Sequence, residues 1–249
     1  MTVYHGIGVV FATPCLTQTV SLEYVRSIIE TDYLLWQNGI TTAMLQRPGD
    51  CFVEKARNRL VNDFLTQFPD CENFFFLDDD IGWPAQKVLE FLQRPDDVVA
   101  GIYPKKSAEV DFPVGFAYHD DGTLNEPGNG LVEAWTIPTG FMRIKRHVLE
   151  KMAEKYGTYK DMDLDENGES VIRDYPNIFV CGPNPEMDNL YTGEDTMFCF
   201  RWQKMGGSMW VDPDIEFMHR GTKRWKENMK NHMQIIRDKA ALLKKEAAE

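Results

Sequence analysis

Apolar runs and amphipathic stretches alternate along roughly the first hundred residues. Mostly apolar, β-branched or aromatic runs predict buried strands at 4–12, 40–45, 73–77 and 98–103. Between these runs, apolar residues recur every three or four positions, which predicts helices over 21–39, 53–68 and 84–95. Alternating strands and helices are typical of βαβ units on a parallel sheet that is covered on both faces. This pattern predicts an α/β fold whose first half, 1–105, is Rossmann-like.

Shorter strands and more turns characterise the second half, 106–221. Turn signals at Asp121-Gly122 and at 127–130 precede an expected strand pair between 131 and 144, and a helix is expected over 146–156. The stretch 223–249 contains no Gly or Pro and is rich in Lys, Glu, Ala and Leu, which predicts a helix. We therefore expect a single domain over 1–249, with a mixed second half and a C-terminal basic helix at 222–249.

Composition and charge exclude several classes of protein. With 43% hydrophobic and 27% charged residues, the chain has the composition of a soluble globular protein. Its net charge of −12 argues against a general polyanion binder, although 219–249 carries nine Lys and Arg against four Asp and Glu. The five scattered cysteines form no C-x-x-C pair, and no apolar run reaches the ~18 residues of a membrane span. We expect reduced thiols, no transmembrane segment and a cytoplasmic location.

An acidic triplet carries the strongest chemical signal. The apolar run 73–77 leads directly into Asp78, Asp79 and Asp80. Three adjacent carboxylates repel one another, so they are tolerated in water or beside a cation. Ligands of open α/β sheets bind at the carboxyl ends of the strands, and Asp78 and Asp80 point the same way on an extended chain. The triplet therefore predicts a divalent-cation site, and an acidic turn before the next helix is the structural alternative.

This strand-terminal D-x-D resembles that of the GT-A class of nucleotide-sugar-dependent glycosyltransferases. The resemblance implies a GT-A fold with a nucleotide-sugar-binding first half and an acceptor-binding second half. It implies that Asp80 binds manganese or magnesium and that Asp78 contacts the nucleotide-sugar. Asp78 is a second candidate metal ligand, and Asp79 takes either role.

Three further segments match that class in order. Thr13 and Pro14, at the end of the first strand, lie where the class holds the nucleotide base. Arg57, in Ala56-Arg57-Asn58, resembles an element near the nucleotide or diphosphate, and an exposed helical arginine is the alternative. Gly140, in the segment TGFM, resembles the small-residue loop on the acceptor side, where a glycine allows close approach of a sugar; a simple turn is the alternative.

Glu194 and Asp195 open an expected amphipathic helix in GEDTMFCFRWQ. Carboxylates at a helix N-terminus are favoured by the helix dipole, and an ionised carboxylate can accept a proton from an attacking hydroxyl. In the resembling families such a pair contacts the acceptor and supplies the base of inverting members. Helix capping without chemistry is the alternative.

The segment MHRGTKRW supplies the last candidates. His219 follows an expected strand and suits a metal site, and imidazole favours manganese over magnesium. The segment resembles the H-x-G-x-x-K-P-W element of glycogenin-like retaining glycosyltransferases. Here the lysine is one residue closer and an arginine replaces the proline, so either Lys223 or Arg224 is the diphosphate contact. Trp225 is assigned to the acceptor side.

Together these features predict a metal-dependent glycosyltransferase of bacterial or bacteriophage type. The expected donor is a nucleotide-sugar, with a UDP-sugar favoured, and the acceptor is a hydroxyl of a glycan or of a hydroxymethylated DNA base. A sugar nucleotidyltransferase is one alternative, but the segment after the first strand lacks a glycine-rich phosphate loop. A non-catalytic carbohydrate-binding module is another, although it has no need of Glu194-Asp195. Inversion and retention both stay open.

Overall fold

The computed structural model describes residues 2–107, 109–165, 167–221 and 224–246. Its α-helices are α1 (Leu22–Gln37), α2 (Val53–Gln67), α3 (Ala85–Gln93), α4 (Arg146–Tyr156), α5 (Glu194–Gln203) and α6 (Lys230–Glu246), with a short 3-10 helix, η1 (Pro185–Met187). The strands of the largest sheet are β1 (Val9–Cys15), β2 (Thr42–Pro48), β3 (Asn73–Leu77), β5 (Val98–Gly101), β6 (Gly115–Phe116), β7 (Val132–Thr136), β8 (Phe141–Lys145) and β13 (Met209–Asp212). The smaller sheets contain β4 (Ile81–Gly82), β9 (Thr158–Leu164), β10 (Ser170–Pro176), β11 (Gly182–Asn184), β12 (Leu190–Thr192), β14 (Glu216–Arg220) and β15 (Arg224–Asn228).

The central eight-stranded sheet has the order β2-β1-β3-β8-β5-β13-β7-β6. β1 pairs in parallel with β2 and β3, and β5 pairs in parallel with β13. β8 runs antiparallel between β3 and β5, and β7 runs antiparallel between β13 and β6. Most strands therefore point in one direction. This confirms the predicted α/β fold, with a Rossmann-like first half and a mixed second half.

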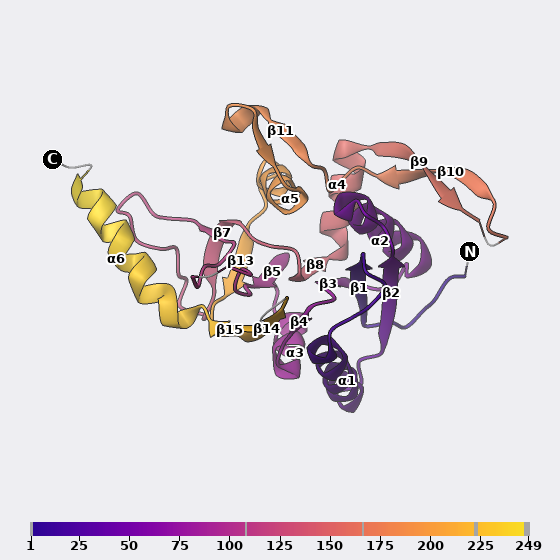
Figure 1. The fold of residues 1–249 in the computed structure, drawn as a ribbon, viewed down its shortest axis with the longest axis horizontal. Coiled ribbons are helices and arrows are strands. Elements are labelled where there is room, and N and C mark those ends of the chain that lie inside the picture. Colours follow the sequence, from indigo (N-terminus) through magenta and orange to yellow (C-terminus); the bar gives the residue numbers. More distant parts are fainter. Residues whose placement is uncertain (1, 108, 166, 222–223, 247–249) are drawn as a thin grey trace.

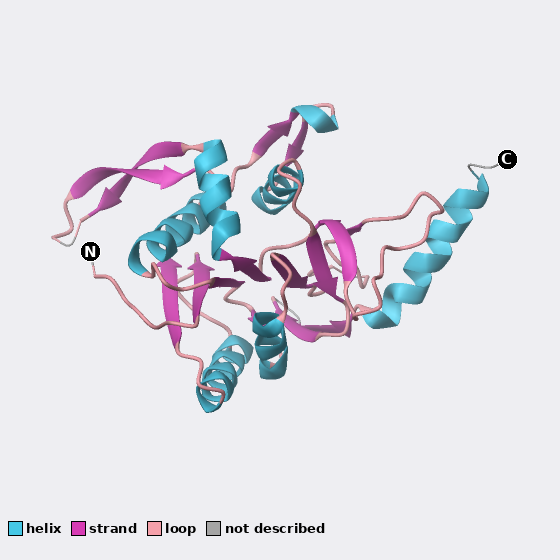
Figure 2. Ribbon diagram, turned by 180° about the vertical axis from the view of Figure 1, so that it is seen from behind, coloured by secondary structure: helices cyan, strands magenta, loops and turns pink. Residues whose placement is uncertain are grey.

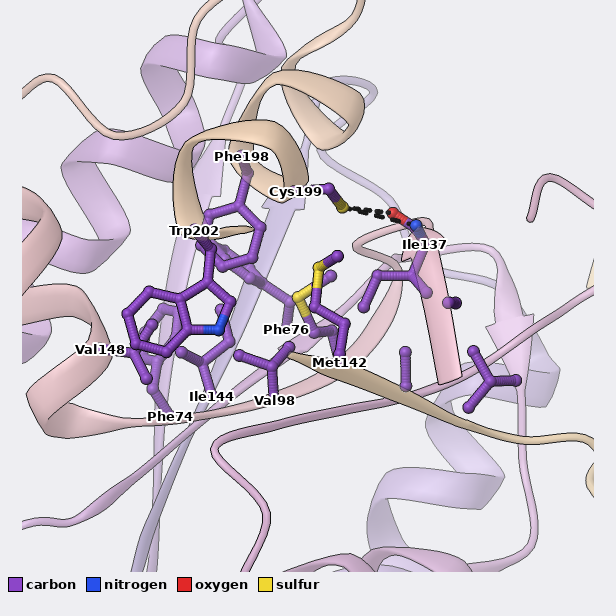
Figure 3. Close-up of a cluster of buried hydrophobic side chains, with 14 of the residues drawn as sticks. Phe74, Phe76, Val98, Ile137, Met142, Ile144, Val148, Phe198, Cys199 and Trp202 are labelled. Atoms are coloured by element: carbon purple, nitrogen blue, oxygen red, sulfur yellow. Dashed lines mark hydrogen bonds between the residues drawn. The ribbon is translucent and has the colours of Figure 1, made fainter. Parts of the chain in front are cut away.

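Helices cover both faces of this sheet. Figure 1 shows α1 and α3 on one face and α2, α4 and α5 on the other, and Figure 2 shows the same layers from behind. Side chains of β3 alternate between the two faces: Phe74 and Phe76 belong to the buried cluster on the α2 side, Phe75 and Leu77 to the cluster on the α1 side. In Figure 3, Phe198 of α5 lies over the first cluster. A strand buried on both faces explains the uninterrupted apolar run that precedes the acidic triplet.

Two local predictions were wrong. β7 and β8 do not pair with each other, because each is inserted between other strands of the sheet. The helix expected over 223–249 begins only at Lys230, since 224–228 form β15 and pair with β14. Pairing with a neighbouring strand here outweighs helix propensity. Within the described part of the chain, no helix combines the length and apolar character needed to span a membrane.

Candidate active site

The acidic triplet lies at the carboxyl end of β3, as its sequence position predicted. Leu77, the last residue of β3, pairs with Phe141 of β8. The next backbone N–H, that of Asp78, donates to the carbonyl oxygen of Gly140 at 2.8 Å. The start of the triplet is therefore fixed by the backbone of the central sheet and does not belong to a free loop.

Asp78 is held by two donors from different elements. Its Oδ1 accepts a hydrogen bond from Arg57 Nη2 at 3.1 Å, and its Oδ2 accepts one from the Tyr103 hydroxyl at 3.2 Å. Arg57 also donates from Nε to Glu194 Oε1 at 3.2 Å. The candidates Arg57, Asp78 and Glu194, from α2, the end of β3 and the start of α5, thus form one ion-pair chain.

Arg57 is not the exposed helical arginine that was the alternative interpretation. Only 4% of it is exposed, and its guanidinium lies 4.9 Å from the centre of the Phe76 ring. Burial by itself lowers the pKa of Arg57, but the adjacent carboxylates of Asp78 and Glu194 raise it above its usual value, so the cation persists. Its Nη1 atom is buried without a hydrogen-bond partner.

Gly140 permits the close contact around Asp78. A Cβ atom at this position would lie 2.3 Å from Asp78 Oδ2 and 2.4 Å from the Tyr103 hydroxyl oxygen. Side chains larger than hydrogen are therefore incompatible with the Asp78–Tyr103 pair as it stands. The close contact with Asp78, on the candidate donor side, explains why residue 140 is a glycine. The predicted contact of Gly140 with an acceptor stays a prediction.

Asp80 and His219 converge although 138 residues separate them in the sequence. β4, which directly follows the triplet, pairs antiparallel with β14 and sets Ile81 opposite His219. The Arg220 N–H donates to the Asp80 carbonyl at 2.8 Å. This backbone register brings His219 Nε2 to 3.4 Å from Asp80 Oδ1.

The histidine ring is held with Nε2 directed towards Asp80. His219 Nδ1 lies 2.6 Å from the carbonyl oxygen of Pro104, and only a protonated Nδ1 can donate to a carbonyl. Nε2 faces the Asp80 carboxylate: it donates to Asp80 in the protonated ring and carries a lone pair for a cation in the neutral ring. A backbone carbonyl on the other ring nitrogen is a common feature of metal-binding histidines. His219 is nearly buried, at 9% exposure.

Lys106 contacts the same carboxylate from the other side. Its ammonium forms an ion pair with Asp80 Oδ2. Burial by itself raises the pKa of Asp80, but hydrogen bonds with His219 and Lys106 hold it below its usual value. Asp80 is therefore anionic at neutral pH.

Asp79 points to a different neighbour. Its carbonyl accepts from the Ser21 N–H at 2.8 Å, which ties the triplet to the start of α1. Burial raises the pKa of Asp79, a hydrogen bond with Cys15 lowers it, and the adjacent carboxylates of Asp80 and Asp78 raise it again, leaving it above its usual value. Asp79 therefore faces the end of β1, where the nucleotide base was predicted.

At the start of α5, Asp195 lies beside the ion-pair chain. Its Oδ1 accepts a hydrogen bond from the Thr196 N–H at 2.6 Å. Burial and repulsion by Glu194 raise the pKa of Asp195 above that of an ordinary aspartate. A carboxylate with a raised pKa is a better proton acceptor at neutral pH.

The remaining candidates are placed as follows. Thr13 is buried and hydrogen-bonded to the Tyr24 hydroxyl at 2.7 Å, and Pro14, next to it at the end of β1, is partly exposed. Lys223 lies outside the described residues. The backbones of Arg224 and Trp225 in β15 pair with Arg220 and His219, respectively.

Sequence reasoning missed the segment 103–106, which follows β5. Tyr103, Pro104 and Lys106 contact Asp78, His219 and Asp80, respectively. The Tyr103 and His219 rings also meet edge to face, with centroids 4.9 Å apart. The available signal was positional: β5 runs in the same direction as β3, so residues that follow it reach the same edge of the sheet.

Comparisons with known proteins bear on the fold. No family model and no curated protein matches the chain. The solved structure of A197 from STIV is similar, with a TM-score of 0.51 and 21% identity over 90% of this chain and 91% of A197. This likeness shows a shared fold alone.

Two other solved structures overlap with the chain more loosely. A glycosyltransferase involved in the glycosylation of the major capsid of PBCV-1 has a TM-score of 0.34 and 13% identity, over 59% of this chain and 66% of its own. The 4-diphosphocytidyl-2C-methyl-D-erythritol synthase from Anaerococcus prevotii has a TM-score of 0.35 and 10% identity, over 61% and 77%. Overlaps of this extent do not indicate the function of this chain.

Proposed function

We propose that this protein is a metal-dependent glycosyltransferase that moves a sugar from a nucleotide-sugar to a hydroxyl acceptor. The observation that carries the proposal is the convergence of Asp80 and His219 at the carboxyl end of β3, with 3.4 Å between Oδ1 and Nε2. The ring is held by the Pro104 carbonyl so that Nε2 faces the carboxylate. A backbone carbonyl that accepts from one ring nitrogen is a common partner of histidines that bind a metal through the other nitrogen.

The donor set fits manganese or magnesium. Asp80 and His219 would hold the cation, since carboxylate oxygen and imidazole nitrogen suit manganese in particular. Among the residues that the structure describes, no group of three or more His, Cys, Asp or Glu side chains is arranged to hold a metal ion. Two protein ligands leave coordination positions for diphosphate oxygens and water. A bound cation stabilises the negative charge that grows on a departing diphosphate.

The ion-pair chain beside this pair suits donor binding. Arg57 and Tyr103 fix the Asp78 carboxylate at the edge of the sheet, where Asp78 accepts hydrogen bonds from a sugar or ribose hydroxyl. Arg57 Nη1, buried and without a partner, is the donor left over for a ligand oxygen.

Asp195 is the proposed base. Its raised pKa and its place beside the Arg57–Glu194 pair put a proton acceptor next to the donor site, and Glu194 orients the acceptor hydroxyl.

DNA is one acceptor to test, because the C-terminal stretch 219–249 is positively charged. If DNA is the acceptor, its binding should weaken steeply as the salt concentration rises. Two basic residues in the described part of α6 already form ion pairs within the protein: Lys230 with Asp214, and Arg237 with Glu126.

The test is release of nucleoside diphosphate from a panel of nucleotide-sugars, with and without manganese, after a thermal-shift screen to find the donor. Asp80→Asn should lower manganese-dependent turnover by at least about 100-fold, the scale on which loss of one charge-stabilising group acts. Asp120→Asn, an exposed aspartate in a turn, is the matched control and should behave like the wild type. Full activity of Asp80→Asn with an unchanged manganese response would remove this mechanism, and release of pyrophosphate from a nucleoside triphosphate would indicate a nucleotidyltransferase.

A further inference from the structure

A short segment after β5 connects both halves of the site. Between Tyr103 and Lys106, the chain donates a hydroxyl to Asp78, offers a carbonyl to His219 and places an ammonium on Asp80. The first two contacts orient groups whose free faces remain available to a ligand. The third is different, because Lys106 occupies an oxygen of the carboxylate on which a cation would have to bind.

Lys106 is placed for more than one partner. Its side chain is 37% exposed and that of Asp80 is 31% exposed, so the ion pair is partly open to solvent and does not lie inside the core. Its charge also acts on Asp79, so it balances the middle of the triplet as well. A long, flexible lysine side chain at such a position can move to another anion within its reach at small cost.

A lysine and a divalent cation compete for Asp80. Two positive groups on one carboxylate repel each other, so the ammonium on Asp80 Oδ2 weakens the binding of a cation to Oδ1, and its movement away from Asp80 strengthens that binding. Once displaced, the ammonium needs a new anion. The diphosphate of a nucleotide-sugar brings negative charge to this same edge of the sheet, and lysine is a common ligand of phosphate.

We propose that Lys106 is a diphosphate-binding residue that makes cation binding depend on the nucleotide. Without a nucleotide, Lys106 neutralises Asp80 and weakens the binding of a free cation. With a nucleotide-sugar, Lys106 transfers to the diphosphate and releases Asp80 to the cation. By linkage, the cation and the diphosphate then strengthen each other's binding. The inference rests on the proposed function and adds a residue and a binding order to it.

The experiment measures equilibrium binding and not turnover. Manganese is titrated into the full chain and the free ion is followed by electron paramagnetic resonance. Inorganic pyrophosphate, which carries the diphosphate chemistry without a base, is titrated by calorimetry at fixed manganese. Lys106→Gln removes the charge, and Lys106→Arg keeps it. Lys105→Gln is the matched control, because Lys105 is the adjacent lysine and pairs with Asp111 at 2.6 Å instead of with the triplet.

Lys106→Gln should change the affinity for manganese and the affinity for pyrophosphate in opposite directions. Lys106→Gln should bind manganese alone about tenfold more tightly and manganese-dependent pyrophosphate about tenfold more weakly, within the roughly 5- to 150-fold range of known couplings. Lys106→Arg and Lys105→Gln should stay close to the wild type in both titrations. Manganese affinity of Lys106→Gln that is unchanged or weaker, in a variant whose thermal unfolding matches the wild type, would overturn the inference.

A further variant separates this outcome from failure of the proposed function. Asp80→Asn should lose manganese binding in the same titration. If Asp80→Asn binds manganese like the wild type, the cation site itself is wrong and the proposed function fails with it. If Asp80→Asn loses manganese while Lys106→Gln behaves like the wild type, the cation site stands and only the role of Lys106 is refuted.

Discussion

Gly140→Ala tests whether the geometry around Asp78 matters for function. The new Cβ would lie 2.3 Å from Asp78 Oδ2 and 2.4 Å from the Tyr103 hydroxyl oxygen, and real Cβ contacts essentially never fall below 3.0 Å. Moving from 2.3 to 3.0 Å requires a shift of at least 0.7 Å. The backbone cannot supply it easily, because the Asp78 N–H is bonded to the Gly140 carbonyl and the adjoining β3 is paired with β8 on one side and β1 on the other.

The shift therefore falls on side chains that are already constrained. Tyr103 packs against the Phe217 and His219 rings, so its displacement also disturbs the histidine. Asp78 moves away from Arg57, whose hydrogen bond is 3.1 Å long. Overpacking of this kind costs about 1–3 kcal/mol of stability. A displacement approaching 1 Å at a reacting centre costs about 100-fold in rate.

We expect Gly140→Ala to fold, to lose about 1–3 kcal/mol in urea unfolding and to lose about 100-fold in kcat/KM. Gly182→Ala is the control for stability, because its Cβ would meet nothing within 4 Å and its φ is not positive. A loss of stability without any loss of kcat/KM would refute the role given to Asp78. Wild-type behaviour in both measurements would refute the steric reasoning itself.

The remaining predictions concern Arg57 and the adjacent carboxylates of Glu194 and Asp195. Arg57→Met removes the cation shared by Asp78 and Glu194, and we expect about 3–5 kcal/mol lower stability in urea unfolding, partly recovered in the double variant Arg57→Met, Glu194→Gln. If Asp195 is the base, its raised pKa sets an acidic limb of kcat/KM above the usual aspartate range, and activity falls as pH decreases through it. Glu194→Gln removes the repelling charge and should shift that limb to lower pH in a pH profile, whereas a limb that stays in place would exclude Glu194 as a cause.

The first half of the fold was readable from local pattern because its signals are local. The helix that begins at Leu22 is capped by the Ser21 side chain, which accepts from the Tyr24 N–H at 3.1 Å, and serine is a preferred residue at this position. The apolar run of β3 identified a strand buried on both faces and thereby placed Asp78 at a sheet edge. Each of these inferences needs only a few adjacent residues.

Strand order was not readable in this way. β7 and β8 are close in sequence and suggested a pair, but β8 lies between β3 and β5. Residues Phe141, Met142 and Ile144 are all fully buried, which suits a central position better than a hairpin. A run of apolar residues shows that a strand is buried but does not show which strands lie beside it, because pairing depends on the remainder of the sheet.

Site residues with a local sequence signal were predicted, whereas those placed by strand pairing alone were missed. His219 was found through its resemblance to a known motif, whereas the pairing of β4 with β14 that brings it to Asp80 has no local signature. Lys106 was missed because it lies in a loop without a motif, and one exposed lysine resembles many others in a sequence. What distinguishes Lys106 is its ion pair with Asp80, which exists only after β5 and β3 have been placed in one sheet.

Two positive side chains, Arg57 and Lys106, lie against the acidic triplet. The groups that meet Asp78, Asp80 and His219 come from α2 and from the segment after β5, so the fold itself places the positive charges of Arg57 and Lys106 against the triplet. Arg57 is buried and bridges two carboxylates, so it remains in place when a ligand binds. Lys106 is partly exposed and pairs with the Asp80 carboxylate, so under the proposed function it can exchange that partner for a ligand. In that proposal, burial makes Arg57 a fixed support for the donor site and leaves Lys106 as a movable contact for the diphosphate.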